Sequence, residues 1–439
     1  MNRHKPKRNR GVILTREGWR KLQKAKLEGE LREKSGSKYT LEEISERAGL
    51  TSNTVAKILT NQEGVDKRTL VYLFMAFNLE LNPQDYFKLN TDLERLQVSK
   101  VPKRVDWGEM VDVSVFYGRT DELTLLEQWL IQERCRVVAL LGMGGIGKTT
   151  LAAKLSQKVQ GWFEYVIWRS LYNAPPLFDL LANLIQFFSN EQVLETDLPK
   201  NVDGRISHLI EYLQQQRCLI ILDNVETIMQ TGAYAGCYRE GYEDYGLLIK
   251  RLGQVMHQST LVLTSREKPK DIASLGGETL AVRSLQLSGL EVVAGQKIFE
   301  AKGFSGSESE LPAVVERYAG NALALKIVAT TIQDVFDGNV AEFLQHYTAV
   351  FGSIRDLLDQ HFSRLANLEK DIIYWLAINR EPVSLSEIRE DIVSPIAPQN
   401  LLEALESLVR RSLVEKSTAL FTLQPVVMEY VTQRSILFG

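Results

Sequence analysis

Cysteine and histidine are scarce in this chain, and their scarcity limits the chemistry that it can carry out. Only three cysteines and five histidines occur among the 439 residues. Cys135, Cys218 and Cys237 form no close pair, which is typical of reduced packing residues in a cytosolic protein rather than of a disulfide framework. The histidines have no metal-ligand spacing, so the sequence does not predict a histidine-based metal site.

Long apolar runs and regular repeats are also absent. No apolar stretch approaches the roughly 18 residues of a membrane span. The basic N-terminus is followed only by the short apolar run Val12-Ile13-Leu14, which is too short for the core of a signal peptide. With 44% apolar and 24% charged residues, the composition is that of a globular chain. We therefore expect a cytoplasmic protein, without a membrane partner, of about three domains.

The net charge of −3 is unevenly distributed along the chain. Residues 1–104 contain 22 Lys and Arg against 13 Asp and Glu, a balance of +9. The remaining residues contain 30 basic against 42 acidic side chains, a balance of −12. A basic N-terminal part on an acidic body predicts that the two parts meet different partners, and nucleic acid is the natural candidate for the first.

A glycine-rich segment between two apolar stretches is the most informative part of the sequence. Residues 142–150 read GMGGIGKTT and follow the apolar run of residues 137–141. A buried strand, a glycine loop and a helix start form the setting of a phosphate-binding loop, in which backbone N–H groups and the helix N-terminus bind phosphate. The candidate nucleotide-binding residues of this loop are Gly142, Gly144, Gly145, Ile146, Gly147, Lys148, Thr149 and Thr150.

The residue types in and beyond the loop indicate their roles. Lys148 has the length and charge to reach the β- and γ-phosphates, and Thr149 can offer its hydroxyl to Mg²⁺. A second apolar strand, residues 218–222, ends in Asp223. Ligands bind at the carboxyl ends of buried parallel strands, so Asp223 is predicted to hold the same Mg²⁺ through a water. The expected cofactors are ATP or ADP with Mg²⁺.

Residues 40–59 have the pattern of two short helices joined by a tight turn. Thr40 and Glu43 make a capping box, and Gly49 can end the first helix. The spacing predicts a helix-turn-helix whose second, recognition helix covers residues 51–59. The positions expected to pack inward are Ile44, Ala48, Leu50, Val55, Ile58 and Leu59.

Three side chains of the second helix face outward in this arrangement and are the candidate nucleic-acid contacts. Asn53 can address adenine, while Ser52 and Lys57 can hold phosphates. The same fold also serves as a protein-interaction module, so DNA and protein both remain candidate partners of this region.

From Val115 to near Arg434, the order of motifs resembles the NB-ARC family of STAND ATPases. That family includes the apoptotic protease-activating factor, plant disease-resistance proteins and many bacterial regulators. The resemblance covers about three quarters of the chain. It implies an α/β doubly wound P-loop NTPase domain followed by a helical domain and a winged helix, which close around ADP. A small all-α helix-turn-helix domain precedes them.

The resemblance also implies further nucleotide contacts. The segment Phe116-Tyr117-Gly118-Arg119 is similar to the family's adenine-binding element, and Arg119 is its candidate side chain. Residues 261–266 resemble the sensor strand, whose arginine, here Arg266, approaches the γ-phosphate. Ala322 stands where the family has an adenine-packing proline, and Leu323 can fill the same space. Gln424 replaces the histidine that contacts the ADP β-phosphate, so the closed-state latch is expected to be weaker or different.

Asn224 departs from the family pattern, because a second acid usually orients the attacking water there. An amide can position water but cannot take its proton. Glu226 is an alternative acid whose side-chain direction the sequence leaves open. Together with Lys148, Asp223 and Arg266, Asn224 completes the predicted catalytic set of a weak ATPase. Arg169, at the end of another apolar run, is either a surface charge or a phosphate contact.

These observations predict six regions. They are a basic disordered arm at 1–14, a helix-turn-helix domain at 15–90, a linker at 91–113, a P-loop domain at 114–283, an ARC-type helical domain at 284–350 and a winged-helix domain at 351–439. Sensor repeats usually follow the winged helix in this family. The chain stops at Gly439 without them, so we expect either a truncated chain or a signal that is received by other means.

The function predicted from the sequence is that of a bacterial-type signal-transduction switch. Nucleotide exchange, with slow hydrolysis, would control opening, self-association and the N-terminal effector. The alternative is a DNA-binding transcriptional regulator in which nucleotide is mainly structural. A third possibility is an ATPase with steady turnover, against which Asn224 argues.

Overall fold

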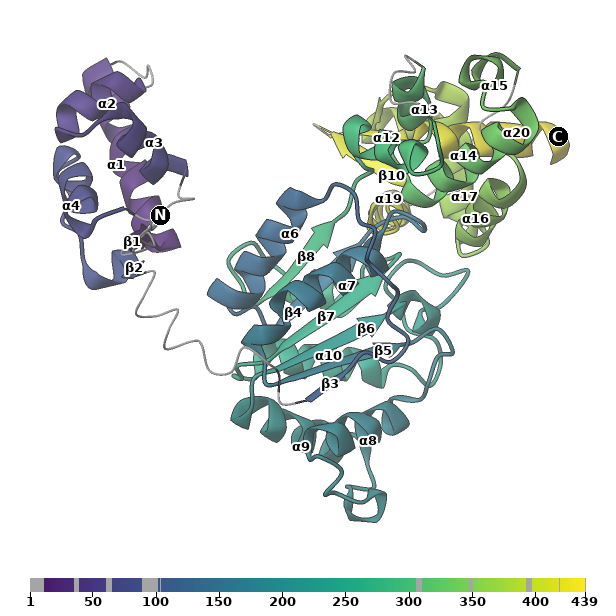
Figure 1. Cartoon of the computed structure of the whole chain (residues 1–439). Helices are drawn as coiled ribbons and strands as arrows, with labels where there is room; N and C mark the ends of the chain where they lie inside the picture. Colours follow the sequence, from purple (N-terminus) through teal and green to yellow (C-terminus); the bar gives the residue numbers. More distant parts are fainter. Residues whose placement is uncertain are drawn as a thin grey trace, which may run out of the picture. The chain divides into compact units, whose positions relative to one another are not determined.

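The computed structural model forms two compact units, residues 1–100 and 101–439, which are described separately (Figure 1). The residues that it describes are 12–34, 39–60, 65–88, 102, 104–304, 310–346, 350–391, 397–417 and 419–438. Residues 1–11 of the predicted basic arm therefore lie outside the described residues. Its last three residues, Val12–Leu14, form strand β1, so that end of the arm was assigned wrongly.

The N-terminal unit consists of helices and a two-stranded sheet. Its further elements are α1 (Arg16–Lys34), α2 (Leu41–Ala48), α3 (Ser52–Thr60), α4 (Lys67–Ala76), η1 (Pro83–Asp85) and β2 (Tyr86–Lys88). β1 pairs antiparallel with β2, which corrects the expectation of an all-α domain. The strands form because Val12 and Leu14 are buried at 5% and 1% exposure in the same core as the helices.

The predicted helix pair of residues 40–59 is present as α2 and α3. The capping box of Thr40 and Glu43 is confirmed, and Gly49 ends α2 in the left-handed conformation at φ 64°. All six positions predicted to face inward belong to this unit's core or pack against it. Ser52 and Asn53 are exposed and Lys57 is half-buried, so α3 presents polar side chains on its outer face.

A six-stranded parallel sheet forms the centre of the second unit. Its strands are β3 (Arg104–Asp106), β4 (Val137–Leu141), β5 (Tyr165–Ser170), β6 (Cys218–Asp223), β7 (Thr260–Ser265) and β8 (Val282–Gln286). The spatial order is β3-β5-β6-β7-β4-β8, and every neighbouring pair is parallel. β7 therefore lies between the strand that leads into the glycine loop and the strand that ends in Asp223. The carboxyl ends of all three meet at one edge of the sheet.

Alternate side chains of the strands enter two separate cores, one on each face of the sheet. One core contains the helices α8 (Leu177–Phe188), α9 (Val202–Gln215), α10 (Asp244–Gln254) and α11 (Lys270–Leu275). The other contains α6 (Thr120–Glu127), the π-helix η2 (Gln128–Gln132) and α7 (Lys148–Val159). Figure 1 shows the sheet between these two groups of helices. The predicted doubly wound α/β architecture is confirmed.

Two predicted boundaries of the nucleotide domain need correction. The linker was expected to reach residue 113, but Arg104–Asp106 already pairs with β5 as an edge strand. Arg104 pairs with Glu191 at 2.6 Å and Asp106 with Arg169 at 2.7 Å, so charged side chains hold a segment that lacks apolar periodicity. At the other end, the expected boundary after residue 283 cuts through β8.

The remainder of the second unit is mostly helical. Its helices are α12 (Val292–Glu300), α13 (Leu311–Arg317), α14 (Ala322–Phe336), α15 (Val340–His346), α16 (Gly352–Phe362), α17 (Asn367–Asn379), α18 (Leu385–Asp391), α19 (Pro398–Arg410) and α20 (Pro425–Phe438). The antiparallel strands β9 (Val383–Ser384), β10 (Val414–Ser417) and β11 (Leu420–Leu423) have the order β10-β11-β9. One continuous core extends from Ile298 to Val431 and also includes Met143 of the glycine loop. The two predicted C-terminal domains therefore share one core.

Two expectations from composition can be compared with the described residues. Cys135 and Cys218 are buried beside strands, as expected of packing residues, whereas Cys237 is exposed. None of the helices that the structure describes is long and apolar enough to cross a membrane.

Candidate functional site

The glycine loop between β4 and α7 has the backbone geometry of an anion-binding loop. Gly145 and Gly147 have positive φ values of 76° and 104°, a conformation that favours glycine. A Cβ atom at Gly145 would lie 2.6 Å from the Cβ of Leu323, so a larger residue would not fit there. α7 begins at Lys148 directly after Gly147, which places the free N–H groups of its first turn at the loop.

The side chain of Lys148 is a buried cation, and no carboxylate of the described residues lies at ion-pair distance from it. It is 7% exposed, and its Nζ donates to the carbonyl oxygens of Gly142 at 2.8 Å and Met143 at 3.0 Å. Burial lowers the pKa of Lys148 to about 8, although the charge of Glu226 acts in the opposite direction. A buried ammonium group held by carbonyl oxygens alone fits an anionic ligand such as phosphate.

The two predicted Mg²⁺ ligands lie next to each other. The Thr149 hydroxyl donates to Asp223 Oδ1 at 2.9 Å, and the Thr264 hydroxyl donates to the same oxygen at 2.5 Å. Burial raises the pKa of Asp223, while the hydrogen bonds from Thr264 and Thr149 lower it. Among the described residues no group of three acidic, histidine or cysteine side chains could hold a metal ion. A hydroxyl and one carboxylate beside a phosphate loop nevertheless fit Mg²⁺, which keeps several waters and takes its other ligands from phosphate.

The end of β7 brings Arg266 to the glycine loop. A Cβ atom at Gly144 would lie 3.3 Å from Arg266 Cζ. Arg266 Nε lies 3.1 Å from Glu226 Oε1, and Arg266 Nη1 donates to Gln360 Oε1 of α16 at 3.2 Å. Arg266 thus stands beside the loop, where its sequence-predicted contact with a γ-phosphate remains a prediction.

The side chain of Glu226, whose direction the sequence leaves open, points into the site. Glu226 lies on the short 3-10 helix η5 (Val225–Ile228) and is 7% exposed. Asn224 has φ 62°, and its amide donates to Asp223 Oδ2 at 3.1 Å and to the Ser170 hydroxyl at 3.5 Å. The predicted catalytic residues Lys148, Asp223, Asn224 and Arg266 are therefore brought together, with Glu226 among them.

The predicted adenine-binding arginine is committed to contacts within the protein. Arg119 is 8% exposed and donates to Glu122 Oε1 at 2.7 Å, to the Ile146 carbonyl at 3.1 Å and to the Ser288 carbonyl at 2.6 Å. It therefore fastens the segment before α6 to the glycine loop and to the end of β8. Phe116 and Tyr117 are half-buried, as is Thr150. Contact of Phe116, Tyr117 or Arg119 with adenine, and of Thr150 with phosphate, stays a prediction.

Asn321 is a site residue that the sequence analysis missed. Its Nδ2 donates to the Gly144 carbonyl at 2.9 Å, while its Oδ1 caps α14 by accepting from the N–H groups of Leu323 and Ala324 at 3.2 Å. The Leu323 N–H also donates to the Gly145 carbonyl at 3.0 Å. The start of α14 therefore supports the glycine loop from outside, and Ala322 is half-buried beside it. An asparagine at a helix start was the available signal.

His361 of α16 is the second residue that the sequence analysis missed. Its Nε2 accepts a hydrogen bond of 2.9 Å from the Gly144 N–H, and its side chain is buried. Burial, followed by the charges of Arg266, Lys148, Arg364 and Arg411, lowers the pKa of His361 well below its usual range. The neutral ring therefore accepts the hydrogen bond of a loop N–H group that could otherwise bind phosphate. The one signal in the sequence was a histidine that continues the apolar stripe Ile354, Leu357 and Leu358.

Three buried charges and the half-buried Arg364 join the end of β7 to the C-terminal segment. Glu267 and Glu369 are 1% and 0% exposed. Arg411 pairs with both at 3.0 Å, and Arg364 pairs with Glu267. Arg364 also donates to the Glu226 carbonyl at 3.0 Å. These residues, which we call the buried charge cluster, carry two positive and two negative charges and compensate one another.

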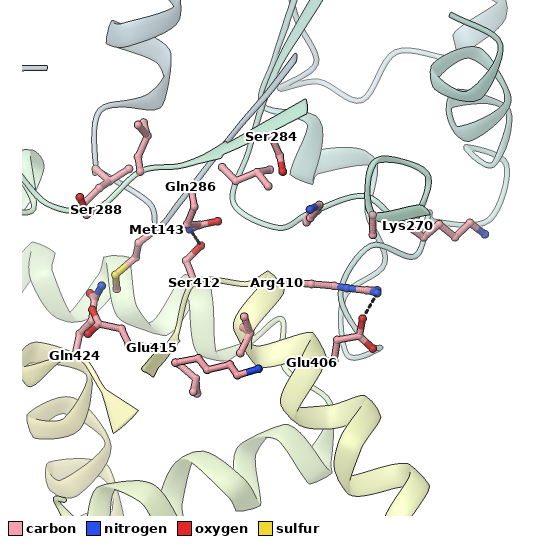
Figure 2. Close-up of a pocket in the computed structure, with 18 of the residues that line it drawn as sticks. Met143, Lys270, Ser284, Gln286, Ser288, Glu406, Arg410, Ser412, Glu415 and Gln424 are labelled. Atoms are coloured by element: carbon pink, nitrogen blue, oxygen red, sulfur yellow. Dashed lines mark hydrogen bonds and ion pairs between the residues drawn. The ribbon is translucent and has the colours of Figure 1, made fainter. Parts of the chain in front are cut away.

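Gln424, which was predicted to stand in for the family's latch histidine, lines a cleft. The cleft has a volume of about 970 Å³ and lies between the β8–α11 side of the nucleotide domain and the α19–β10 segment. Figure 2 shows Gln424 and Met143 at one end of it, with Lys270 and Glu406 at the other. His361 of α16 is thus the residue of the C-terminal segment that bonds the loop backbone, while Gln424 lines the cleft together with Met143 of the loop.

Arg169 and the helix-turn-helix candidates do not belong to this site. Arg169 donates to Asp106 Oδ2 at 2.7 Å and Asn183 Oδ1 at 2.7 Å, which favours the alternative of a structural charge. Ser52, Asn53 and Lys57 belong to the N-terminal unit, and their contact with nucleic acid remains a prediction.

Comparison with known proteins supports the assignment of the second unit. Residues 119–307 match the NB-ARC domain family. The chain is 53% identical over 343 residues to an uncharacterized WD repeat-containing protein of Nostoc sp. (strain PCC 7120), a match that covers 75% of this chain and 27% of that protein. It is 36% identical over 98 residues to the disease resistance protein RPM1 of Arabidopsis thaliana, which covers 21% of this chain and 10% of that protein. The chain thus spans about a quarter or less of these relatives.

A solved structure has a similar fold. The Walker-type ATPase PABY2304 of Pyrococcus abyssi aligns with a TM-score of 0.50 at 15% identity, covering 72% of this chain and 96% of that one. At this identity the likeness concerns the fold alone.

The role of Lys148 can be tested by removing its charge. Lys148→Ala should weaken binding of ADP by roughly 100-fold or more, because a buried charge-assisted hydrogen bond to phosphate is lost. Titration of a fluorescent ADP analogue measures the affinity. Lys158→Ala is the matched control, since Lys158 lies on the same helix but pairs with Glu127 at the surface at 2.7 Å. Equal affinity of the Lys148 variant and wild type would refute the site.

The contact between His361 and Gly144 should respond to pH. The pKa of His361 is lower when its ring is packed against the loop, which we call the packed form, than when the ring is exposed. The packed form is therefore fully stabilised above about pH 6.5. Below that pH its free energy of packing falls by about 1.4 kcal/mol per pH unit. Hydrogen exchange of the peptide around residues 141–151, corrected for intrinsic rates, should therefore lose protection between pH 6.5 and 5. His361→Gln keeps an acceptor but does not titrate, so its protection should stay constant.

The control for this experiment is His257→Gln. Burial also lowers the pKa of His257, which bonds the Leu252 carbonyl at 2.9 Å in another part of the unit. That variant should keep the acid response of the loop peptide. An unchanged acid response in His361→Gln would show that other groups cause it.

Proposed function

Since the chain belongs to the NB-ARC family of P-loop NTPases, we propose that it is a signalling switch set by exchange of ADP for ATP. The observation that carries this proposal is the hydrogen bond from the Gly144 N–H to His361. An oxygen of the γ-phosphate, which ATP has and ADP lacks, is an acceptor like the His361 nitrogen and would compete with it for the same donor. Nucleotide binding and packing of the C-terminal segment are therefore linked through one N–H group.

The difference between the two nucleotides acts through Arg266. In the packed form this arginine bonds Glu226 and also Gln360 of α16. A γ-phosphate attracts the guanidinium away from both partners, whereas ADP leaves them in place. ATP thus weakens the hold of the nucleotide domain on α16 and favours opening, which is the differential affinity that a two-state switch requires.

The buried charge cluster acts as the latch of the packed form. Glu267 directly follows Arg266 in the chain, so the residue that meets the phosphate and the residue that meets Arg364 and Arg411 are neighbours. Truncating one partner of a buried ion pair costs about 3–5 kcal/mol, because its partner stays buried without compensation. A change at the end of β7 can therefore shift the balance between packed and open forms.

In the open form the chain associates with further copies and presents the N-terminal unit as effector. Hydrolysis resets the switch. It is slow because the amide of Asn224 is bonded to Asp223 and Ser170 and cannot take a proton.

Bound nucleotide and its exchange test this proposal. Protein purified and then denatured should release about one ADP per chain, with Mg²⁺. Arg411→Ala should release ADP at least tenfold faster than wild type, because it uncouples the latch. Arg410→Ala is the matched control, because Arg410 pairs with Glu406, which is mostly exposed, and its variant should exchange at the wild-type rate. Equal exchange rates in both variants would rule out the latch, and a chain that binds neither nucleotide would rule out the switch.

A second candidate function, a DNA-binding regulator in which nucleotide is mainly structural, is favoured by the outer face of α3. Asn53 and Ser52 are exposed there, on a unit whose surrounding sequence carries excess positive charge. If this function holds, the full chain should shift duplex DNA, and the shift should weaken steeply with salt. Asn53→Ala and Lys57→Ala should each weaken binding, by about 1–3 kcal/mol for a specific base contact. Arg68→Ala, an exposed basic residue on α4, is the control that should bind normally.

A further inference from the structure

The side-chain amide of Asn224 is engaged in hydrogen bonds within the protein and is not available to position the attacking water. It donates to Asp223 Oδ2 at 3.1 Å and to the Ser170 hydroxyl of β5 at 3.5 Å. The left-handed backbone at Asn224, with φ 62°, then starts η5. The next acidic side chain, Glu226, lies on η5 and contacts Arg266 in the site.

Glu226 faces the groups that would surround the phosphates. It is 7% exposed, its Oε1 lies 3.1 Å from Arg266 Nε, and its Oε2 accepts from the Arg266 N–H at 3.3 Å. Of the carboxylates that favour the charged form of Lys148, Glu226 acts more strongly than Asp223. The charge of Glu226 therefore acts on the ammonium group that is predicted to bind the β- and γ-phosphates.

We infer that Glu226 is the general base of ATP hydrolysis in this chain and that Arg266 holds it inactive in the packed form. The inference rests on the proposed function, because it requires a bound ATP. A water oxygen forms a bond to Pγ as the bond between Pγ and the β,γ-bridging oxygen breaks. The water proton goes to the Glu226 carboxylate and from there to solvent, and ADP departs with the electron pair of the broken bond.

The ion pair with Arg266 explains why such a base would work slowly. The two carboxylate oxygens of Glu226 are engaged by the guanidinium and the backbone N–H of Arg266, so they are not free to bind the attacking water. The same guanidinium bonds Gln360, and the Glu226 carbonyl accepts from Arg364. In the packed form the backbone of Glu226 is thus bonded directly to the C-terminal segment, and its carboxylate is linked to that segment through Arg266. Release of Arg266 toward a γ-phosphate frees the carboxylate, so the base becomes active when the switch opens.

Glu226→Gln separates this role from a merely structural one. Glutamine keeps an oxygen that can accept from Arg266 but cannot take a proton. In single-turnover assays with Mg²⁺-ATP, it should lower the rate of phosphate release by at least 100-fold, the range of general-base catalysis. Affinity for a non-hydrolysable ATP analogue should stay within threefold of wild type. Glu226→Asp should give an intermediate rate, and the exposed Glu243→Gln should equal wild type.

Each other outcome is decisive. If wild type hydrolyses ATP and Glu226→Gln does so at the same rate, only this inference fails, and the switch stands. If the variant loses ATP affinity together with turnover, the role of Glu226 is structural and the inference fails. If wild type binds ATP but forms no phosphate, hydrolysis and its base fail together while nucleotide binding stands. If wild type binds no nucleotide, the proposed function fails as well.

Discussion

The buried positive charge of Lys148 is the constraint on which the site depends. It lies at the point where three parallel strands end, and in the packed form its ammonium group donates to the carbonyl oxygens of Gly142 and Met143. Such a charge requires compensation from its surroundings. Glu226 and Asp223 supply part of it at longer range, while Arg266 and the neutral ring of His361 complete the surroundings. A phosphate group would compensate Lys148 directly, so ligand binding and rearrangement of these neighbours are parts of one electrostatic balance.

Local patterns were sufficient to predict the nucleotide domain. Apolar runs bounded by polar residues gave β4, β6 and β7 almost to the residue, because strands that are buried on both faces contain little else. The glycine loop, Lys148, Thr149, Asp223 and Arg266 could be located because each lies at, or shortly after, the carboxyl end of one of these strands. The helix pair near the N-terminus was likewise predictable, since its caps are local in sequence.

Features that depend on distant parts of the chain could not be predicted in this way. His361 meets Gly144 across more than two hundred residues, and Arg411 finds Glu267 and Glu369 only once the C-terminal segment has folded. The short strand β3 was missed because Arg104 and Asp106 are held by charged partners rather than by an apolar pattern. The direction of Glu226 depends on the left-handed turn at Asn224, a conformation that asparagine permits but does not require.

The buried charge cluster would have a consequence for the solubility of the open form that we propose. An interface closed only by apolar side chains would expose adhesive surface on separation and favour aggregation. The guanidinium and carboxylate groups of Arg364, Arg411, Glu267 and Glu369 instead regain hydration when they part, which offsets much of the lost Coulomb energy. A surface of this kind can separate and close again repeatedly, because each state leaves its charges either paired or hydrated.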